Sequence, residues 1–131
     1  GVDPKLISVM VFLDRATVNN GCLMVAAGTH KWGRLEHSAD EVTTSYRQWC
    51  VDTGILKERQ REEMIRHVTG EPGDALFFHC NLLHGSGHNM SPLARKTFII
   101  AYNDAANRPR PVENRRPDWV VSRSYEPVSS R

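Results

Sequence analysis

The chain has 131 residues and a mass of 14.8 kDa, which suits one domain with a modest core. Its 17 Lys and Arg against 15 Asp and Glu give a net charge of +2, too small to indicate a nucleic-acid or anionic-membrane binder. No apolar run approaches the roughly 20 residues of a membrane helix. Three cysteines without a close pair (Cys22, Cys50 and Cys80) favour a reducing, cytoplasmic compartment.

The first predicted element is a strand over residues 6–13, where apolar and β-branched residues fill both faces. The segment Val18-Asn19-Asn20-Gly21 predicts a turn, because Asn-Gly adopts a positive φ at low cost. A second apolar run follows over residues 22–27, and the two runs are interpreted as a hairpin-like pair. Residues 29–54 are polar and are expected to be irregular.

Residues 55–67 predict a solvated surface helix inserted between strands, with sparse apolar positions and pairs of opposite charge at i and i+4. A short strand is predicted over residues 75–79, and a strong one over residues 95–102. The tail from residue 105 is rich in proline and arginine, and we expect it to be mostly extended coil.

Short strands joined by turns predict an all-β fold, an antiparallel sandwich or jelly roll. About five strands are predicted, whereas a jelly roll has eight. Half a barrel would leave strand edges and a core open. Residues 1–104 are therefore expected to pair with a second copy, as a homodimer, or to form the C-terminal part of a larger domain, with residues 105–131 as its tail.

The densest cluster of metal-binding side chains follows the strand over residues 75–79: His79, Cys80, His84 and His88 lie within ten residues. Neutral imidazole is a ligand for zinc and iron, so this cluster is a candidate metal site. Turn residues around one core histidine are the alternative. A structural zinc site made by these four residues is a third interpretation, although adjacent strand residues point to opposite faces.

Arg95 begins the last predicted strand, and strand alternation places it on one face with Thr97, Ile99 and Ala101. On an inward face, a guanidinium needs an anion and can bind a carboxylate through two hydrogen bonds. The alternative is a half-exposed arginine that leads into the strand.

Two stretches of the sequence resemble motifs of the phytanoyl-CoA dioxygenase superfamily, most closely its ectoine-hydroxylase-like bacterial branch. The first is Gly-Cys-Leu-Met-Val-Ala-Ala-Gly-Thr-His-Lys-Trp-Gly over residues 21–33, similar to NGxLxxxPGSHxxG with Ala27 and Thr29 in place of Pro and Ser. The second runs from Pro72 to Arg95 and is similar to PGDxxFFxxxxxHGSxxNxxxxxR. The two motifs occur in the family's order, and the resemblance extends from about Leu6 to Asn103.

The resemblance implies a double-stranded β-helix that carries an Fe(II)- and 2-oxoglutarate-dependent dioxygenase, which uses O₂ to hydroxylate a small molecule. It implies that His84 is the distal iron ligand and that Arg95 binds the outer carboxylate of 2-oxoglutarate. The other implied contacts are Ser86 and Ser8 to the same cosubstrate, and Phe78 and Trp32 in the wall of the substrate pocket.

The family's His-x-Asp iron motif is missing, since none of the six histidines has Asp or Glu two residues after it. In the family this pair comes shortly before the strand that begins here near Leu6. One histidine cannot complete a 2-His-1-carboxylate site, so the chain alone is expected to be inactive. A non-catalytic jelly-roll binding module is the alternative. Nucleic-acid binding by the arginine-rich tail is disfavoured, because acidic residues interrupt its charge.

Overall fold

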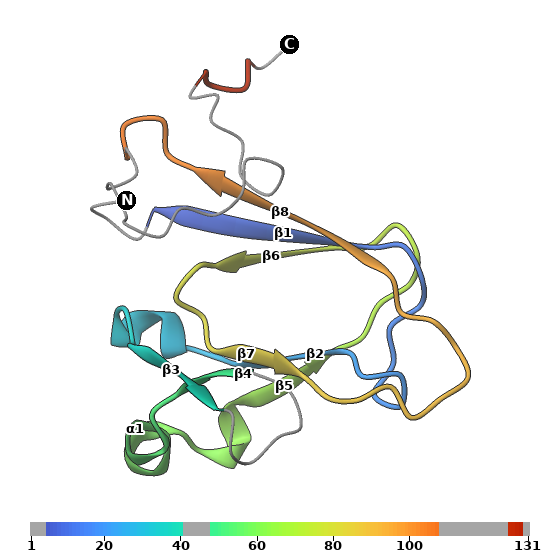
Figure 1. Cartoon of the computed structure of the whole chain (residues 1–131). Coiled ribbons are helices and arrows are strands. Elements are labelled where there is room, and N and C mark those ends of the chain that lie inside the picture. Colours follow the sequence, from blue (N-terminus) through green and yellow to red (C-terminus); the bar gives the residue numbers. More distant parts are fainter. Residues whose placement is uncertain (1–4, 41–47, 108–125, 130–131) are drawn as a thin grey trace.

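The structure, a computed structural model, describes residues 5–40, 48–107 and 126–129. Two three-stranded antiparallel sheets face each other in it (Figure 1). One has the order β6 (Ala75–His79), β1 (Leu6–Phe12), β8 (Thr97–Asn103) and the other β5 (Ile65–Val68), β2 (Leu23–Ala26), β7 (His84–Ser86). This arrangement confirms the predicted all-β jelly-roll class.

A smaller pair, β3 (His37–Asp40) and β4 (Gln48–Val51), and three short helices complete the described residues. The helices are η1 (Thr29–Trp32), α1 (Thr53–Arg59) and η2 (Glu62–Met64). α1 begins where it does because the Asp52 side chain accepts hydrogen bonds from the Gly54 and Ile55 amides. No helix in these ranges is long and apolar enough to span a bilayer.

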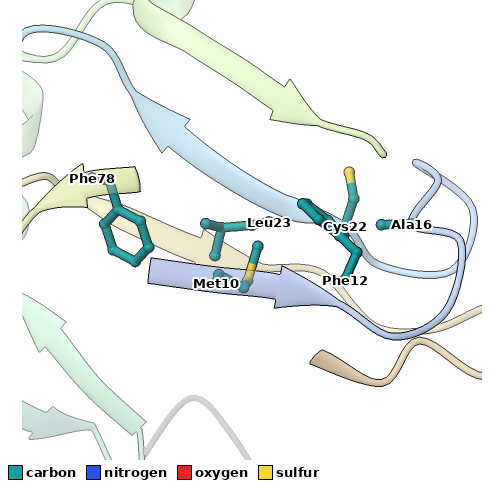
Figure 2. Close-up of a cluster of buried hydrophobic side chains, with 6 residues drawn as sticks. All are labelled: Met10, Phe12, Ala16, Cys22, Leu23 and Phe78. Carbon is teal, nitrogen blue, oxygen red and sulfur yellow. The ribbon is translucent and has the colours of Figure 1, made fainter. Parts of the chain in front are cut away.

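The core lies between the two large sheets, where the inward faces of β1, β2 and β6 meet (Figure 2). Because strand residues alternate between faces, every second residue of β1 points inward, and Met10 and Phe12 are almost fully buried. The cluster consists of Met10, Phe12, Ala16, Cys22, Leu23 and Phe78. Its side chains hold the two sheets together. The other side chains on the inward faces of these strands are thereby held in fixed positions.

The predicted hairpin of residues 6–13 and 22–27 is wrong, because β1 and β2 lie in different sheets. The predicted turn between them is present, with Gly21 at φ 76° and the Asn20 side chain bonded to the Thr17 amide and the Arg15 carbonyl. Between β1 and β2, Ala16 forms an isolated antiparallel bridge with Gly70, which follows β5 of the other sheet. Strand pairing at long range thus decided the partners of β1, which are β6 and β8.

The predicted helix over residues 55–67 is correct only in its first half. After α1 and η2 the chain becomes β5, which pairs with β2 in register, Ala26 opposite Ile65 and Leu23 opposite Val68. The backbone bonds that β2 offers along its edge override the charge pattern that favoured a helix.

The expectation of irregular structure over residues 29–54 is also wrong, because η1, β3, β4 and the start of α1 lie there. Eight strands are present in the described residues, against about five predicted. Most of the predicted tail lies outside the described residues, so the proposed boundary at residues 104 and 105 stays a prediction.

Candidate active site

His84 is the first residue of β7 and lies on the inward face of its sheet. It pairs with Val25 of β2, whose side chain shares the inward face with the buried Leu23. Across the gap between the sheets, the ring of Phe78 contacts the imidazole edge to face, with centroids 5.3 Å apart. His84 therefore stands where the two sheets meet, at the border of the apolar core, and it is still exposed on its other side.

The hydrogen bonding of His84 fixes which ring nitrogen is free. Its Nδ1 lies 2.8 Å from the carbonyl oxygen of Leu82, and a carbonyl can only accept, so Nδ1 carries the proton. In the neutral ring, Nε2 then has the lone pair that a metal ion needs. This is the usual arrangement of a metal-binding histidine, in which a backbone oxygen holds the ring from behind.

The predicted cosubstrate serines both lie on inward-facing strand positions. Ser86 shares the face of β7 with His84 and pairs with Leu23, and Ser8 pairs with Phe78 on β1. Ser8 is half-buried, whereas Ser86 is exposed. The structure brings these hydroxyl groups to the same gap between the sheets from opposite sides.

Arg95 lies two residues before β8 and is half-buried. Its charge is felt by the core: burial raises the pKa of the Cys22 thiol above its usual value, and the Arg95 guanidinium partly offsets this rise. Cys22 belongs to the buried cluster, so the guanidinium acts electrostatically on a residue of the core. Its predicted contact with a carboxylate stays a prediction.

The two predicted substrate-wall residues differ in position. Phe78 is part of the core and contacts His84. Trp32 ends η1 and is half-buried, but it is not among the described residues that line the cavity beside His84. Their roles toward a substrate stay predictions.

An open cavity of about 1180 Å³ extends from the start of β7 toward β3, β4 and α1. His84 and Leu83 line one end, and Val51, Leu56 and Ile65 contribute apolar walls. No sequence pattern indicated this space, because the strands β3 and β4 that frame it were not predicted.

The alternative zinc site is not assembled in the described residues, where no three His, Cys, Asp or Glu side chains are placed to hold one metal ion. His79 instead accepts a hydrogen bond at Nδ1 from the Asn81 amide, 3.1 Å away, and its ring lies 5.7 Å from that of His30. Within the described ranges His84 therefore has no second and third side chain placed to complete a metal site with it.

A sequence profile described as phytanoyl-CoA dioxygenase (PhyH) matches residues 2–97. The chain belongs to the phytanoyl-CoA dioxygenase family. Among curated relatives, the ectoine dioxygenase of Sphingopyxis alaskensis is 34% identical over 97% of this chain, and the L-proline trans-4-hydroxylase of Streptomyces griseoviridis is 31% identical over 95%. The chain spans 44% and 50% of their lengths.

Solved structures agree with this family assignment. The S. alaskensis protein EctD with 2-oxoglutarate and 5-hydroxyectoine superposes with a TM-score of 0.71 at 31% identity, over 94% of this chain and 40% of that one. The same protein with bound Fe gives a TM-score of 0.72 at 29% identity with the same coverage. This phytanoyl-CoA dioxygenase family chain therefore shares the fold of about two fifths of an iron-binding relative.

Proposed function

We propose that this chain is part of a non-haem Fe(II)/2-oxoglutarate-dependent dioxygenase that hydroxylates a small molecule. In this reaction one oxygen atom of O₂ enters a C–H bond of the substrate, and the other enters succinate as 2-oxoglutarate loses CO₂. The observation that carries the proposal is the fixed orientation of His84, whose Nε2 is left available for a metal on the inward face of the fold.

The family context supports the ligand chemistry. A solved relative of the same fold holds Fe, and another structure of it holds 2-oxoglutarate. A 2-His-1-carboxylate iron site keeps positions open for a 2-oxo acid and O₂. In this chain His84 would hold the metal, and Ser86, Ser8 and Arg95 would bind the oxygen atoms of the 2-oxo diacid.

Arg95 has the chemistry that the far carboxylate of 2-oxoglutarate requires. A buried anion is costly unless a cation is fixed next to it, and a guanidinium offers two parallel donors to one carboxylate. The Arg95 guanidinium partly offsets the rise that burial causes in the pKa of the Cys22 thiol, which supports a positive charge that acts on the buried cluster. The apolar side chains of the buried cluster, such as Leu23 and Phe78, would keep water away from the bound diacid.

We propose that the 131 residues alone do not turn over 2-oxoglutarate. The sequence contains no His-x-Asp or His-x-Glu motif, and the described residues offer no cluster of three ligands. The relatives are about twice as long as this chain, so the other two ligands would come from polypeptide outside this sequence.

For the substrate, we propose a small polar amino acid or a compatible solute. Two of the relatives are named for ectoine and L-proline, which are molecules of this kind. The cavity beside His84, at about 1180 Å³, has room for such a molecule.

The decisive experiment measures succinate release in a polypeptide of full family length that contains this chain, with ectoine and proline in the substrate panel. His84→Ala is expected to abolish turnover and to weaken Fe(II) binding, because it removes a metal ligand. His67→Ala is the matched control, since His67 alternates to the other face of its strand. Hydroxylation that persists in His84→Ala, or Fe(II) binding equal to the wild type, would contradict the proposal.

The proposed role of Arg95 is tested by measuring the KM for 2-oxoglutarate and the KM for the hydroxylated substrate separately. Arg95→Ala is expected to raise the apparent KM for 2-oxoglutarate by about ten-fold or more and the KM for the hydroxylated substrate much less, because a charge-assisted bidentate contact is worth roughly 1.5–3 kcal/mol. Arg95→Lys should rescue only in part, since an ammonium lacks the planar fork. Equal effects on both KM values would argue against a carboxylate contact.

A further inference from the structure

Thr29 closes the ladder between β2 and β7 in an unusual way. The register continues one step past the strands, so that Ala26 stands opposite Leu83. The Ala26 amide donates directly to the Leu83 carbonyl, 2.9 Å away. The return bond is not direct: the Leu83 amide donates to Thr29 Oγ1 at 2.9 Å, and that hydroxyl donates to the Ala26 carbonyl at 2.7 Å. The hydroxyl is thus inserted into the last rung of the ladder.

The same peptide group serves His84 on its other side. Leu83 N–H and the Leu82 carbonyl belong to one planar peptide unit. The Leu82 oxygen accepts the His84 Nδ1 proton at 2.8 Å, while the amide is held by Thr29. A continuous series of hydrogen bonds therefore runs from Ala26 through the Thr29 hydroxyl and the 82–83 peptide to the imidazole. Bonds in such a series strengthen one another.

We propose that Thr29 is a positioning residue for His84. Its hydroxyl fixes the plane of the peptide between residues 82 and 83, and this peptide fixes the ring orientation and the Nδ1–H tautomer of His84. The inference rests on the proposed function for its purpose, which is to present Nε2 to a metal ion. The hydrogen-bond series itself exists in the chain whether or not His84 binds metal.

The position demands a particular side chain. It must accept one hydrogen bond and donate another in a space where Thr29 is 0% exposed, so that water cannot take its place. Serine meets this demand, whereas valine has the same shape and offers neither bond. Thr29→Val would leave an amide and a carbonyl facing each other across a methyl group, and the 82–83 peptide would be free to rotate.

Two measurements on this chain test the proposal. Long-range ¹H–¹⁵N NMR at pH 8 reads the tautomer of His84. Amide hydrogen exchange reads the protection of Leu83 against that of Met10 in the core strand β1. In Thr29→Val we expect the His84 signals to shift toward a mixture of tautomers and the Leu83 amide to exchange at least about ten-fold faster, with Met10 changed much less.

Thr29→Ser is expected to keep both readouts near those of the wild type, and Thr69→Val, at an exposed position, is the matched control. A Thr29→Val chain with the wild-type tautomer and slow Leu83 exchange would overturn the proposal, as would a Thr29→Ser chain that behaves like Thr29→Val. If Thr29→Val does not fold, Thr29→Ala carries the same comparison. Failure here leaves the His84→Ala result untouched, and the reverse is also true, so the two proposals fail separately.

Discussion

The two faces of the β6–β1–β8 sheet are built from the same kinds of residue but meet different surroundings. Phe77 and Phe78 are consecutive in β6, and strand alternation sends them to opposite faces. Phe78 is 8% exposed, packed against Leu23 and His84 of the other sheet, whereas Phe77 is 63% exposed. The second sheet, and not the chemistry of the side chain, decides which phenylalanine is buried.

Phe77 is one of several apolar side chains on the outer face of the sheet, and all three strands contribute to them. The register aligns Val9 with Phe77 and Ile100, and Val11 with Phe98, so that large apolar side chains form continuous rows there. Phe98 is 57% exposed, and even on the inner face Ile99 of the edge strand β8 is 58% exposed. Val9, in the middle of these rows, is itself 7% exposed, so the exposed apolar surface consists of Phe77 and Phe98 beside it. Exposed apolar side chains of this size are typical of an interface. The chain spans 44% and 50% of two curated relatives, and we propose that in a polypeptide of their length the additional residues cover Phe77 and Phe98.

The largest expected effect is the difference in stability between alanine variants of the two phenylalanines. Phe78→Ala should lower the free energy of unfolding by about 3–5 kcal/mol, because it leaves a cavity between the sheets. Phe77→Ala is the matched change on the other face of the same strand, and should cost this chain less than about 1 kcal/mol. Urea unfolding followed by circular dichroism measures both. Similar losses in the two variants would mean that the outer face is already packed.

The effect of Phe77→Ala should also depend on the length of the polypeptide that carries it. In a polypeptide of full family length, the cost of Phe77→Ala should rise by about 2 kcal/mol or more, toward that of Phe78→Ala, because the side chain is then covered. The measurement is again urea unfolding, with sedimentation to record the oligomeric state. If the cost stays small in the longer protein, or rises only in a dimer of this chain, further polypeptide of the domain does not cover the outer face.

The same contrast explains what could be predicted from the sequence. β1, β6 and β8 were predictable because their apolar, β-branched runs are strong local signals, as was the turn at Gly21. β7 reads His-Gly-Ser and has no apolar residue, so only its pairing with β2 makes it a strand. β5 likewise depends on its pairing with β2, because its own residues lie in a charge pattern that predicted a helix. The partners of each strand depend on contacts far apart in the chain, which composition and spacing do not reveal.

For the site, the identities of His84, Arg95, Ser86 and Ser8 came from the motif resemblance, and strand alternation then placed His84, Ser86 and Ser8 on inward faces. Two features stayed hidden. The cavity needed β3 and β4, and the contact between Thr29 and Leu83 joins residues 54 positions apart. The threonine was visible only as a departure from the serine of the family's motif, with no indication of what it bonds.

The smallest expected effect concerns the thiol of Cys22, which lies in the buried cluster between the two sheets and is 2% exposed. Burial raises its pKa above the ordinary 9.0, so the folded state keeps the proton that the unfolded state loses. The resulting stability is fully present below pH 9 and is lost as the pH rises from there through the folded-state pKa, with a slope of at most about 1.4 kcal/mol per pH unit. Urea unfolding at pH 7, 9 and 10 should show this loss.

Two variants assign that loss to Cys22 and to its neighbour. Cys22→Ala should be less stable at pH 7 but should lose less with rising pH, while Cys50→Ala, at a half-buried thiol, serves as the matched control. Arg95→Ala should make the alkaline loss extend to higher pH, because the guanidinium no longer offsets the effect of burial on the thiol. An Arg95→Ala chain with the wild-type pH dependence would place the guanidinium away from the core, and with it away from the pocket proposed for 2-oxoglutarate.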